Sequence, residues 1–177
     1  LSLTNFEVKK MFFRLIARWF NGSSDFGGFI SAMLRGDEFE INEYMHRVAL
    51  STFSYFDTGD DPCDVNASEK FYHGFVLGLM VENSKNYIIK SNRESGLGRY
   101  DVIMEPKNTS NVAVIMEFKV LQKGRGEKNL EDTAANALKQ IEEKKYDTEL
   151  LEKGIPKEHI LKYGFAFRGK ECLIKKG

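Results

Sequence analysis

Residues 112–120 read VAVIMEFKV, the most hydrophobic stretch of the chain, and they end with two charged side chains. If this stretch is a strand, alternation places Glu117 and Lys119 on the same face. A strand that is apolar on both faces up to Met116 belongs in the centre of a sheet, where a carboxylate and an ammonium are costly unless they are paired or bind an ion. Taken alone, this strand favours a simple contact between Glu117 and Lys119.

The preceding predicted strand, 99–105, adds a second acid, because Asp101 lies on an otherwise apolar element and can meet Glu117 across the sheet. Two carboxylates close together repel, and the pKa of each rises unless a cation lies between them. A hard ion such as Mg²⁺ resolves this repulsion, keeps several waters and leaves room for a phosphate. Lys119 could then orient or deprotonate an attacking water, or neutralise charge that builds on the phosphorus.

The order of elements in the second part of the chain predicts an α/β fold. A helix that is apolar nearly all round is expected at 67–81, and a helix with one apolar face at 130–146. Strands are expected at 87–90, 99–105, 112–120, 160–167 and 171–175. The order αβββαββ, with two strands that can run parallel on either side of a helix, predicts a mixed β-sheet flanked by helices.

The first part of the chain is expected to be helical and to carry no chemistry. Apolar residues recur at helical spacing through residues 1–56, which predicts three helices in a small bundle or platform. Residues 57–66 (DTGDDPCDVN) are rich in Asp, Gly and Pro, which predicts a linker before a domain at 67–177. The linker aspartates lack the order of an EF-hand, so a solvated acidic loop is favoured over a calcium site.

Composition limits the classes of partner. Lys+Arg and Asp+Glu both total 26 in 177 residues, so any attraction to phosphate must come from a local patch or a metal. Cys63 and Cys172 have no zinc-type or disulfide-type spacing, which fits a cytoplasmic location. Apolar runs are too short to span a membrane, and the sequence opens with no signal peptide. Because it starts at Leu1 within a helical pattern, we expect an excised part of a longer protein.

Motifs along the chain resemble those of a known family. They are Gly98-Arg99-Tyr100-Asp101, then Glu117-Phe118-Lys119, then a helix running from Ala137 through Gln140 to Tyr146. Their spacing resembles the D…ExK…Q pattern of the PD-(D/E)XK nuclease superfamily. With Phe71-Tyr72-His73-Gly74 and the block from Ser91 to Asp101, they look like the nuclease domain at the carboxyl end of prokaryotic AAA-ATPase-like proteins. The resemblance covers most of the chain, although Tyr100 stands where the superfamily name has a proline.

This resemblance implies a restriction-endonuclease-like core and a metal site. Mg²⁺, for which Mn²⁺ can substitute, would be held by Asp101, Glu117 and the backbone carbonyl of Phe118, with Lys119 as the catalytic amine. Gln140 would approach the site from the following helix.

The first core helix of many superfamily members adds another metal ligand. Here His73 and Glu69 are four residues apart on one helical face, and either fits. His73 fits a core histidine bonded to a neighbour equally well, and Glu69 is the weaker candidate because an acid near a helix start is favoured by the dipole alone.

Nucleic-acid contacts are predicted on two loops and one helix end. Arg93 and Arg99 flank a glycine-rich turn, Lys123 and Arg125 lie in a basic loop after the strand at 112–120, and Tyr146 ends the helix after it. A basic loop of this kind is more often simply solvated. The glycine-rich turn lacks a following helix and a GxxxxGK[ST] motif, which argues against a nucleotide site.

The leading functional prediction is a Mg²⁺-dependent deoxyribonuclease, one part of a larger protein with an upstream ATPase. The alternative is a catalytically inactive nuclease-fold module that binds nucleic acid or a protein partner. The sequence makes no prediction of the oligomeric state.

Overall fold

The computed structural model describes residues 26–52, 65–122 and 126–177. One five-stranded sheet runs in the order β1-β2-β3-β4-β5. Its strands are β1 (Tyr87–Ser95), β2 (Gly98–Pro106), β3 (Ala113–Val120), β4 (Ile160–Arg168) and β5 (Glu171–Lys176). The helices are α2 (Phe26–Arg35), α3 (Glu38–Thr52), α5 (Val65–Met80), α6 (Leu130–Glu143) and α7 (Thr148–Glu152), with short 3₁₀ turns η1 (Val81–Lys85) and η3 (Lys157–His159). No helix in these ranges is long and apolar enough to cross a membrane.

The sheet is mixed, as the pattern of elements predicts. β3 and β4 are parallel and are connected through α6, whereas the other neighbouring strands are antiparallel. The αβββαββ order and the restriction-endonuclease-like mixed sheet are therefore confirmed. Two boundaries differ from the prediction by more than two residues: β1 continues to Ser95 instead of ending at Lys90, and α6 ends at Glu143 before a separate α7. The end of β1 is polar, so it carries no alternating apolar signal.

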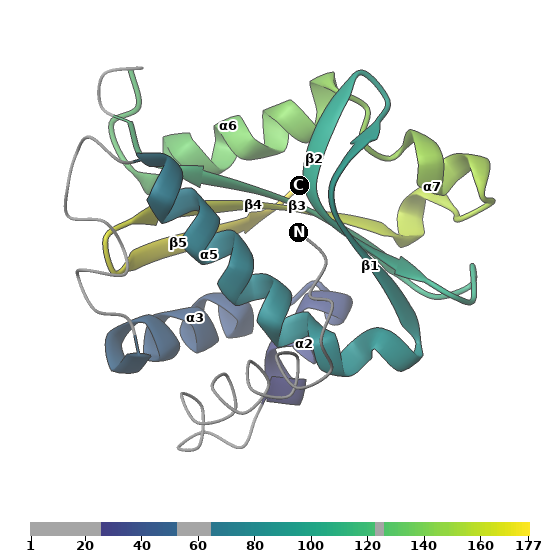
Figure 1. Ribbon diagram of the computed structural model, residues 1–177, viewed down its shortest axis with the longest axis horizontal. Helices are drawn as coiled ribbons and strands as arrows, with labels where there is room; N and C mark the ends of the chain where they lie inside the picture. Colours follow the sequence, from purple (N-terminus) through teal and green to yellow (C-terminus); the bar gives the residue numbers. More distant parts are fainter. Residues whose placement is uncertain (1–25, 53–64, 123–125) are drawn as a thin grey trace, which may run out of the picture.

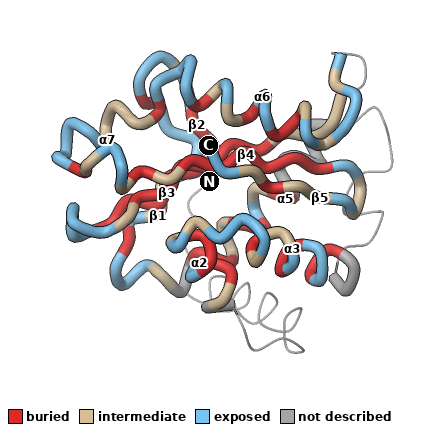
Figure 2. Tube along the Cα trace, turned by 180° about the vertical axis from the view of Figure 1, so that it is seen from behind, coloured by how far each residue is buried: buried red, intermediate tan, exposed pale blue. Residues whose placement is uncertain are grey.

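Helices cover both faces of the sheet (Figure 1). One hydrophobic core joins α2, α3 and α5 to the face of β3 that carries Met116 and Phe118. A second core joins α6, Tyr146 and α7 to the opposite face of β3, which carries Ile115. Figure 2 shows the buried strands running between these two helical layers. The predicted alternation of residues along β3 is confirmed by this division.

The described part of the N-terminal helical segment packs against the sheet. The Tyr163 hydroxyl on β4 donates a hydrogen bond of 2.6 Å to the carbonyl oxygen of Met33 on α2. Asn42 on α3 exchanges hydrogen bonds of 2.8 Å with the backbone of Ile174, which closes part of the free edge of β5. The predicted boundary at 57–66 falls largely outside the described residues and stays a prediction, although α5 already begins at Val65.

Two interruptions in strand pairing meet near Asp101. β2 and β3 pair only between Val102–Met104 and Val114–Met116. Beyond Met116 the two strands separate, and we call this point of separation "the fork". The β1–β2 pairing skips Asn92 and Asp101, and Asn92 has a positive φ of 53°. Asn is among the residues that tolerate this backbone region. The sheet therefore leaves Asp101 at a point where neither flanking strand is paired to it.

Candidate active site

Asp101 lies at the fork with its carboxylate turned toward β3. Its Oδ2 atom accepts a hydrogen bond of 2.8 Å from the backbone N–H of Phe118. Burial raises the pKa of Asp101, and this hydrogen bond together with the charges of His73 and Lys119 offsets the rise only in part. An ionised carboxylate in such a position gains from a nearby cation.

Glu117 and Lys119 lie on the same face of β3, as predicted, and Gln140 bridges them. The Lys119 Nζ atom donates a hydrogen bond of 2.7 Å to Gln140 Oε1 and lies 3.8 Å from Glu117 Oε1. The Gln140 amide nitrogen donates to Glu117 Oε1. Glu117 is only 4% exposed, whereas the Lys119 side chain is 27% exposed. The buried Glu117 carboxylate is therefore held by Gln140 on α6, and the Lys119 amine is partly open to solvent.

Small residues on α6 and β4 allow Gln140 to reach the strand. A Cβ atom added at Gly164 would lie 2.3 Å from the backbone oxygen of Ala134 and 3.1 Å from the Cβ atom of Ala137. The helix thus lies directly on β4, and Gln140 follows Ala137 by one helical turn on the same face. Asn129 caps α6, since its side chain accepts a 2.9 Å hydrogen bond from the N–H of Asp132.

Tyr146 ties β2 to this cluster. Its hydroxyl donates a hydrogen bond of 2.6 Å to the backbone oxygen of Arg99 and accepts one of 3.1 Å from the Gln140 amide nitrogen. The side chain is 1% exposed, and burial raises its pKa. The predicted direct contact of Tyr146 with nucleic acid does not suit this position, because the ring lies in the core between α6 and β2.

His73 reaches the fork from α5 on the other face of the sheet. Its Nε2 atom lies 3.0 Å from Ser91 Oγ and 3.3 Å from the backbone oxygen of Asp101. The ring packs edge-on against Phe118 with centroids 5.7 Å apart. The histidine is thus bonded to neighbours and also placed beside Asp101, so both predicted roles stay open. The side chain of Glu69 lies outside the described set.

A sequence model of the PD-(D/E)XK nuclease superfamily matches residues 67–177. The chain belongs to this superfamily. The match runs from α5 to β5, and it includes the residues that meet at the fork: His73, Asp101, Glu117, Lys119 and Gln140. A search of curated proteins found no match.

Members of the PD-(D/E)XK superfamily generally hydrolyse nucleic acids with a divalent metal, and the residues at the fork fit such an ion. Among the described residues, no group of three or more His, Cys, Asp or Glu could hold a metal. Mg²⁺ needs fewer, since it binds through one or two carboxylates and keeps several waters. Asp101 and Glu117 supply two. The Phe118 N–H points at Asp101, and the carbonyl of a strand residue points to the same edge as its N–H, so this oxygen also faces the fork.

The predicted nucleic-acid contacts of the PD-(D/E)XK domain are only partly described. Arg93 and Arg99 are exposed on the β1–β2 hairpin, and Arg99 Nε donates 2.9 Å to the backbone oxygen of Asn92. Lys123 and Arg125 fall in the segment 123–125, for which the structure gives no description.

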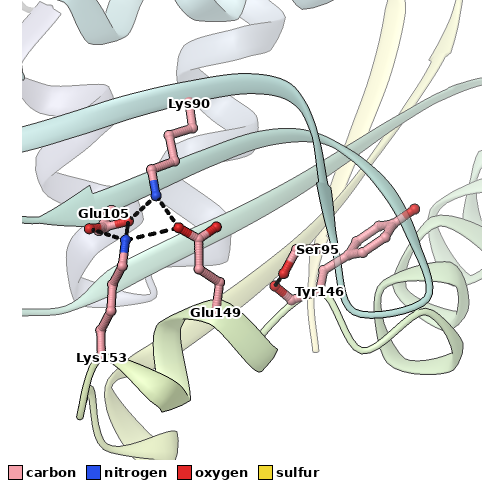
Figure 3. Close-up of polar contacts among 6 residues, drawn as sticks. All are labelled: Lys90, Ser95, Glu105, Tyr146, Glu149 and Lys153. Carbon is pink, nitrogen blue, oxygen red and sulfur yellow. Dashed lines mark hydrogen bonds and ion pairs between the residues drawn. The ribbon is translucent and has the colours of Figure 1, made fainter.

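A charge cluster beside the domain core was not predicted from the sequence. Lys90 on β1, Glu105 on β2, and Glu149 and Lys153 around α7 form a closed network, which we call the charge cluster (Figure 3). Lys153 Nζ lies 2.7 Å from Glu105 Oε2 and 2.9 Å from Glu149 Oε1, and Lys90 contacts both acids at 2.5 Å. Its members are as far as 63 residues apart, so no local motif indicates it. It fastens α7, just beyond Tyr146, to the first two strands.

Proposed function

We propose that this chain is a Mg²⁺-dependent nuclease that hydrolyses phosphodiester bonds of DNA at the fork between β2 and β3. The observation that carries the proposal is that Lys119, Gln140 and Glu117 are joined by hydrogen bonds beside Asp101. Membership in the PD-(D/E)XK superfamily supports a hydrolytic role for this set.

Two carboxylates would hold the metal. Asp101 and Glu117, with the Phe118 carbonyl, would bind Mg²⁺ or Mn²⁺, which would supply positive charge to lower the pKa of a water and to neutralise the phosphate. His73 is a further candidate ligand next to Asp101, and Glu69 on α5 is the weaker one.

Lys119 would act on the reacting phosphate. Its ammonium is fixed on one side by Gln140 Oε1, and its 27% exposure leaves it open to a substrate that enters from solvent. From this position Nζ can donate a hydrogen bond to a phosphate oxygen or orient the attacking water. Hydrolysis then forms a bond between the water oxygen and phosphorus, breaks the bond to the leaving oxygen and returns a proton to that oxygen.

Gln140 would position the other groups. It contacts both the acid and the amine, so one side chain sets the separation of Glu117 and Lys119. Tyr146 fixes Gln140 in turn through its hydroxyl. Arg93, Arg99, Lys123 and Arg125 remain proposed contacts to the nucleic-acid backbone. The association with an ATPase and the cytoplasmic location are proposed from the sequence alone.

The test separates cleavage from binding. Purified native chain and Lys119→Met are compared for cleavage of end-labelled duplex DNA in Mg²⁺, and for binding to the same duplex in EDTA by fluorescence anisotropy. We expect Lys119→Met to lose cleavage and to keep its affinity within about twofold, since one phosphate contact contributes modestly at moderate salt. A native chain that binds DNA but never cleaves it would support the alternative of an inactive binding module.

A further inference from the structure

The tip of the β1–β2 hairpin displays a large apolar side chain. Leu97 lies between Gly96 and Gly98 at the turn and is 69% exposed. Single exposed leucines are common on protein surfaces and need no explanation by themselves. This one differs in how firmly its backbone is held and in the charges around it.

Two hydrogen bonds and one close backbone approach hold the tip against the chain that follows α6, and Figure 1 shows the β1–β2 hairpin beside the end of this helix. The Leu97 N–H donates a hydrogen bond of 2.7 Å to the backbone oxygen of Lys144. Ser95 Oγ donates one of 3.1 Å to the backbone oxygen of Tyr146, as Figure 3 shows. Gly96 has a φ of +59°, and a Cβ atom there would lie 2.3 Å from the backbone oxygens of Lys144 and Lys145. A glycine is therefore required, and Leu97 projects from an anchored turn.

Four cations come from the two segments that meet at the tip. Arg93 and Arg99 come from the hairpin, Lys144 and Lys145 from the end of α6, and all four are exposed. Within the described residues, none of the four forms an ion pair with an acid. The surface is thus positive although the chain as a whole is neutral.

Nearby acids offset this charge only in part. Glu94 is exposed opposite Arg99 on the hairpin and reduces the local charge. Glu142 and Glu143 precede the two lysines but are engaged elsewhere, by Lys162 at 2.8 Å and by Lys139 at 3.6 Å.

The tip adjoins the fork through shared side chains. The backbone oxygen of Arg99 accepts the Tyr146 hydroxyl, and that hydroxyl accepts the amide of Gln140, which in turn contacts Lys119. Leu97 also lies only four residues before Asp101, at most about 13 Å along the hairpin, so a DNA strand with a phosphate at Lys119 is long enough to reach the tip.

We propose that the hairpin tip is a DNA wedge, in which Leu97 inserts at a base step next to the scissile phosphate while Arg93, Arg99, Lys144 and Lys145 hold the backbone. Apolar side chains inserted between base steps unstack them and kink the duplex, and flanking cations hold the phosphates. The inference rests on the proposed function for its substrate. A kinked step would present its phosphodiester to the fork.

Base unstacking provides the test, and it does not depend on cleavage. Duplexes carrying 2-aminopurine at successive positions are titrated with native chain, Leu97→Ala and the control Leu151→Ala in EDTA. Leu151 is an exposed leucine on α7 and is not part of the hairpin. We expect fluorescence to rise at one step with the native chain and the control, to stay flat with Leu97→Ala, and Leu97→Ala to bind about tenfold more weakly.

A second variant tests the cationic part. Replacing Lys144 and Lys145 together by Gln should lower the slope of log affinity against log salt concentration by about 2. An unchanged slope, an unchanged signal in Leu97→Ala, or no signal with the native chain at any position would each overturn the wedge. Cleavage without unstacking refutes the wedge and keeps the nuclease. Unstacking without cleavage in Mg²⁺ supports the wedge and refutes the nuclease.

Discussion

Lys119 donates a hydrogen bond of 2.7 Å to the side-chain oxygen of Gln140, across the gap between β3 and α6. The nearest oxygen of Glu117 lies farther from this amine, at 3.8 Å. The proposed catalytic lysine is thus positioned by a neutral amide, and the charge of Glu117 stays available for a cation.

Replacing Gln140 with Ala should slow DNA cleavage by about 10- to 100-fold, as is usual when a residue that orients metal ligands is lost. The loss should appear in kcat more than in KM. Gln140 positions Lys119 and Glu117, and we do not expect it to bind the DNA away from the scissile phosphate. Steady-state rates on a labelled duplex measure it. Asn136→Ala is the control, since Asn136 lies on the same helix and donates 2.9 Å to Glu127. Equal rates in the two variants would refute the positioning role.

Tyr146→Phe should lower both stability and activity. The change removes the hydrogen bond to the Arg99 carbonyl and the support of Gln140, at a cost of about 1 kcal/mol in unfolding free energy. Tyr163→Phe removes a similar hydroxyl-to-carbonyl bond on the face of the sheet opposite to α6. Urea unfolding should show similar losses in both variants, whereas cleavage should fall only in Tyr146→Phe. A parallel fall in both would mean that stability alone explains the loss.

The strand that carries Glu117 could be predicted because its environment is uniform. Both faces of β3 are buried up to Met116, so period-two alternation and an unbroken apolar run give the same answer. The helix between β3 and β4 separates two apolar strands, and this order indicates their parallel pairing. The strand pattern therefore placed Asp101, Glu117 and Lys119 near each other, whereas only the resemblance to the PD-(D/E)XK superfamily added Gln140.

Other features depend on contacts that no local pattern records. The second half of β1 is polar on both faces, so its pairing with β2 gives no hydrophobic signal. Tyr146 is buried because the hairpin turn packs on the end of α6. This packing requires a glycine at position 96, where the backbone lies against two carbonyl groups. The charge cluster joins residues from three elements and is visible only in three dimensions.

Glu105→Ala should destabilise the fold strongly. The Glu105 carboxylate is buried, with 8% of its side chain exposed, and its removal deprives Lys90 and Lys153 of a partner. Breaking a buried ion pair by removing one member costs about 3 kcal/mol or more. Glu143→Ala, which breaks the exposed pair with Lys139, should change unfolding free energy by less than about 0.5 kcal/mol. A loss under about 1 kcal/mol for Glu105→Ala would show that the cluster is not stabilising.

Acid should weaken the same cluster. Burial acts to raise the pKa of Glu105, but hydrogen bonds from Lys153 and Lys90 outweigh it and hold the pKa below its ordinary value of 4.5. Hydrogen bonds from Lys90 and Lys153 also lower the pKa of Glu149. Lowered pKa values in the folded state mean that the unfolded chain takes up protons first. This stabilisation is complete above the ordinary pKa and is lost as the pH falls through the folded pKa.

Urea unfolding at neutral pH and near pH 4 measures this dependence. The native chain should lose stability over this range, and Glu105→Gln should lose less, because its amide does not titrate. A Glu105→Gln variant with the same pH dependence as the native chain would assign the acid sensitivity to other groups.

The most direct test is the nicking of supercoiled plasmid by the native chain and by Asp101→Asn at equal purity. Asp101→Asn keeps an oxygen that can accept the Phe118 N–H but removes the charge that would hold the metal. We predict nicking by the native chain with Mg²⁺ or Mn²⁺, no nicking in EDTA, and a loss of at least about 100-fold in the variant. Nicking that persists in EDTA, or that is equal in the two chains, would contradict a metal-dependent site at Asp101.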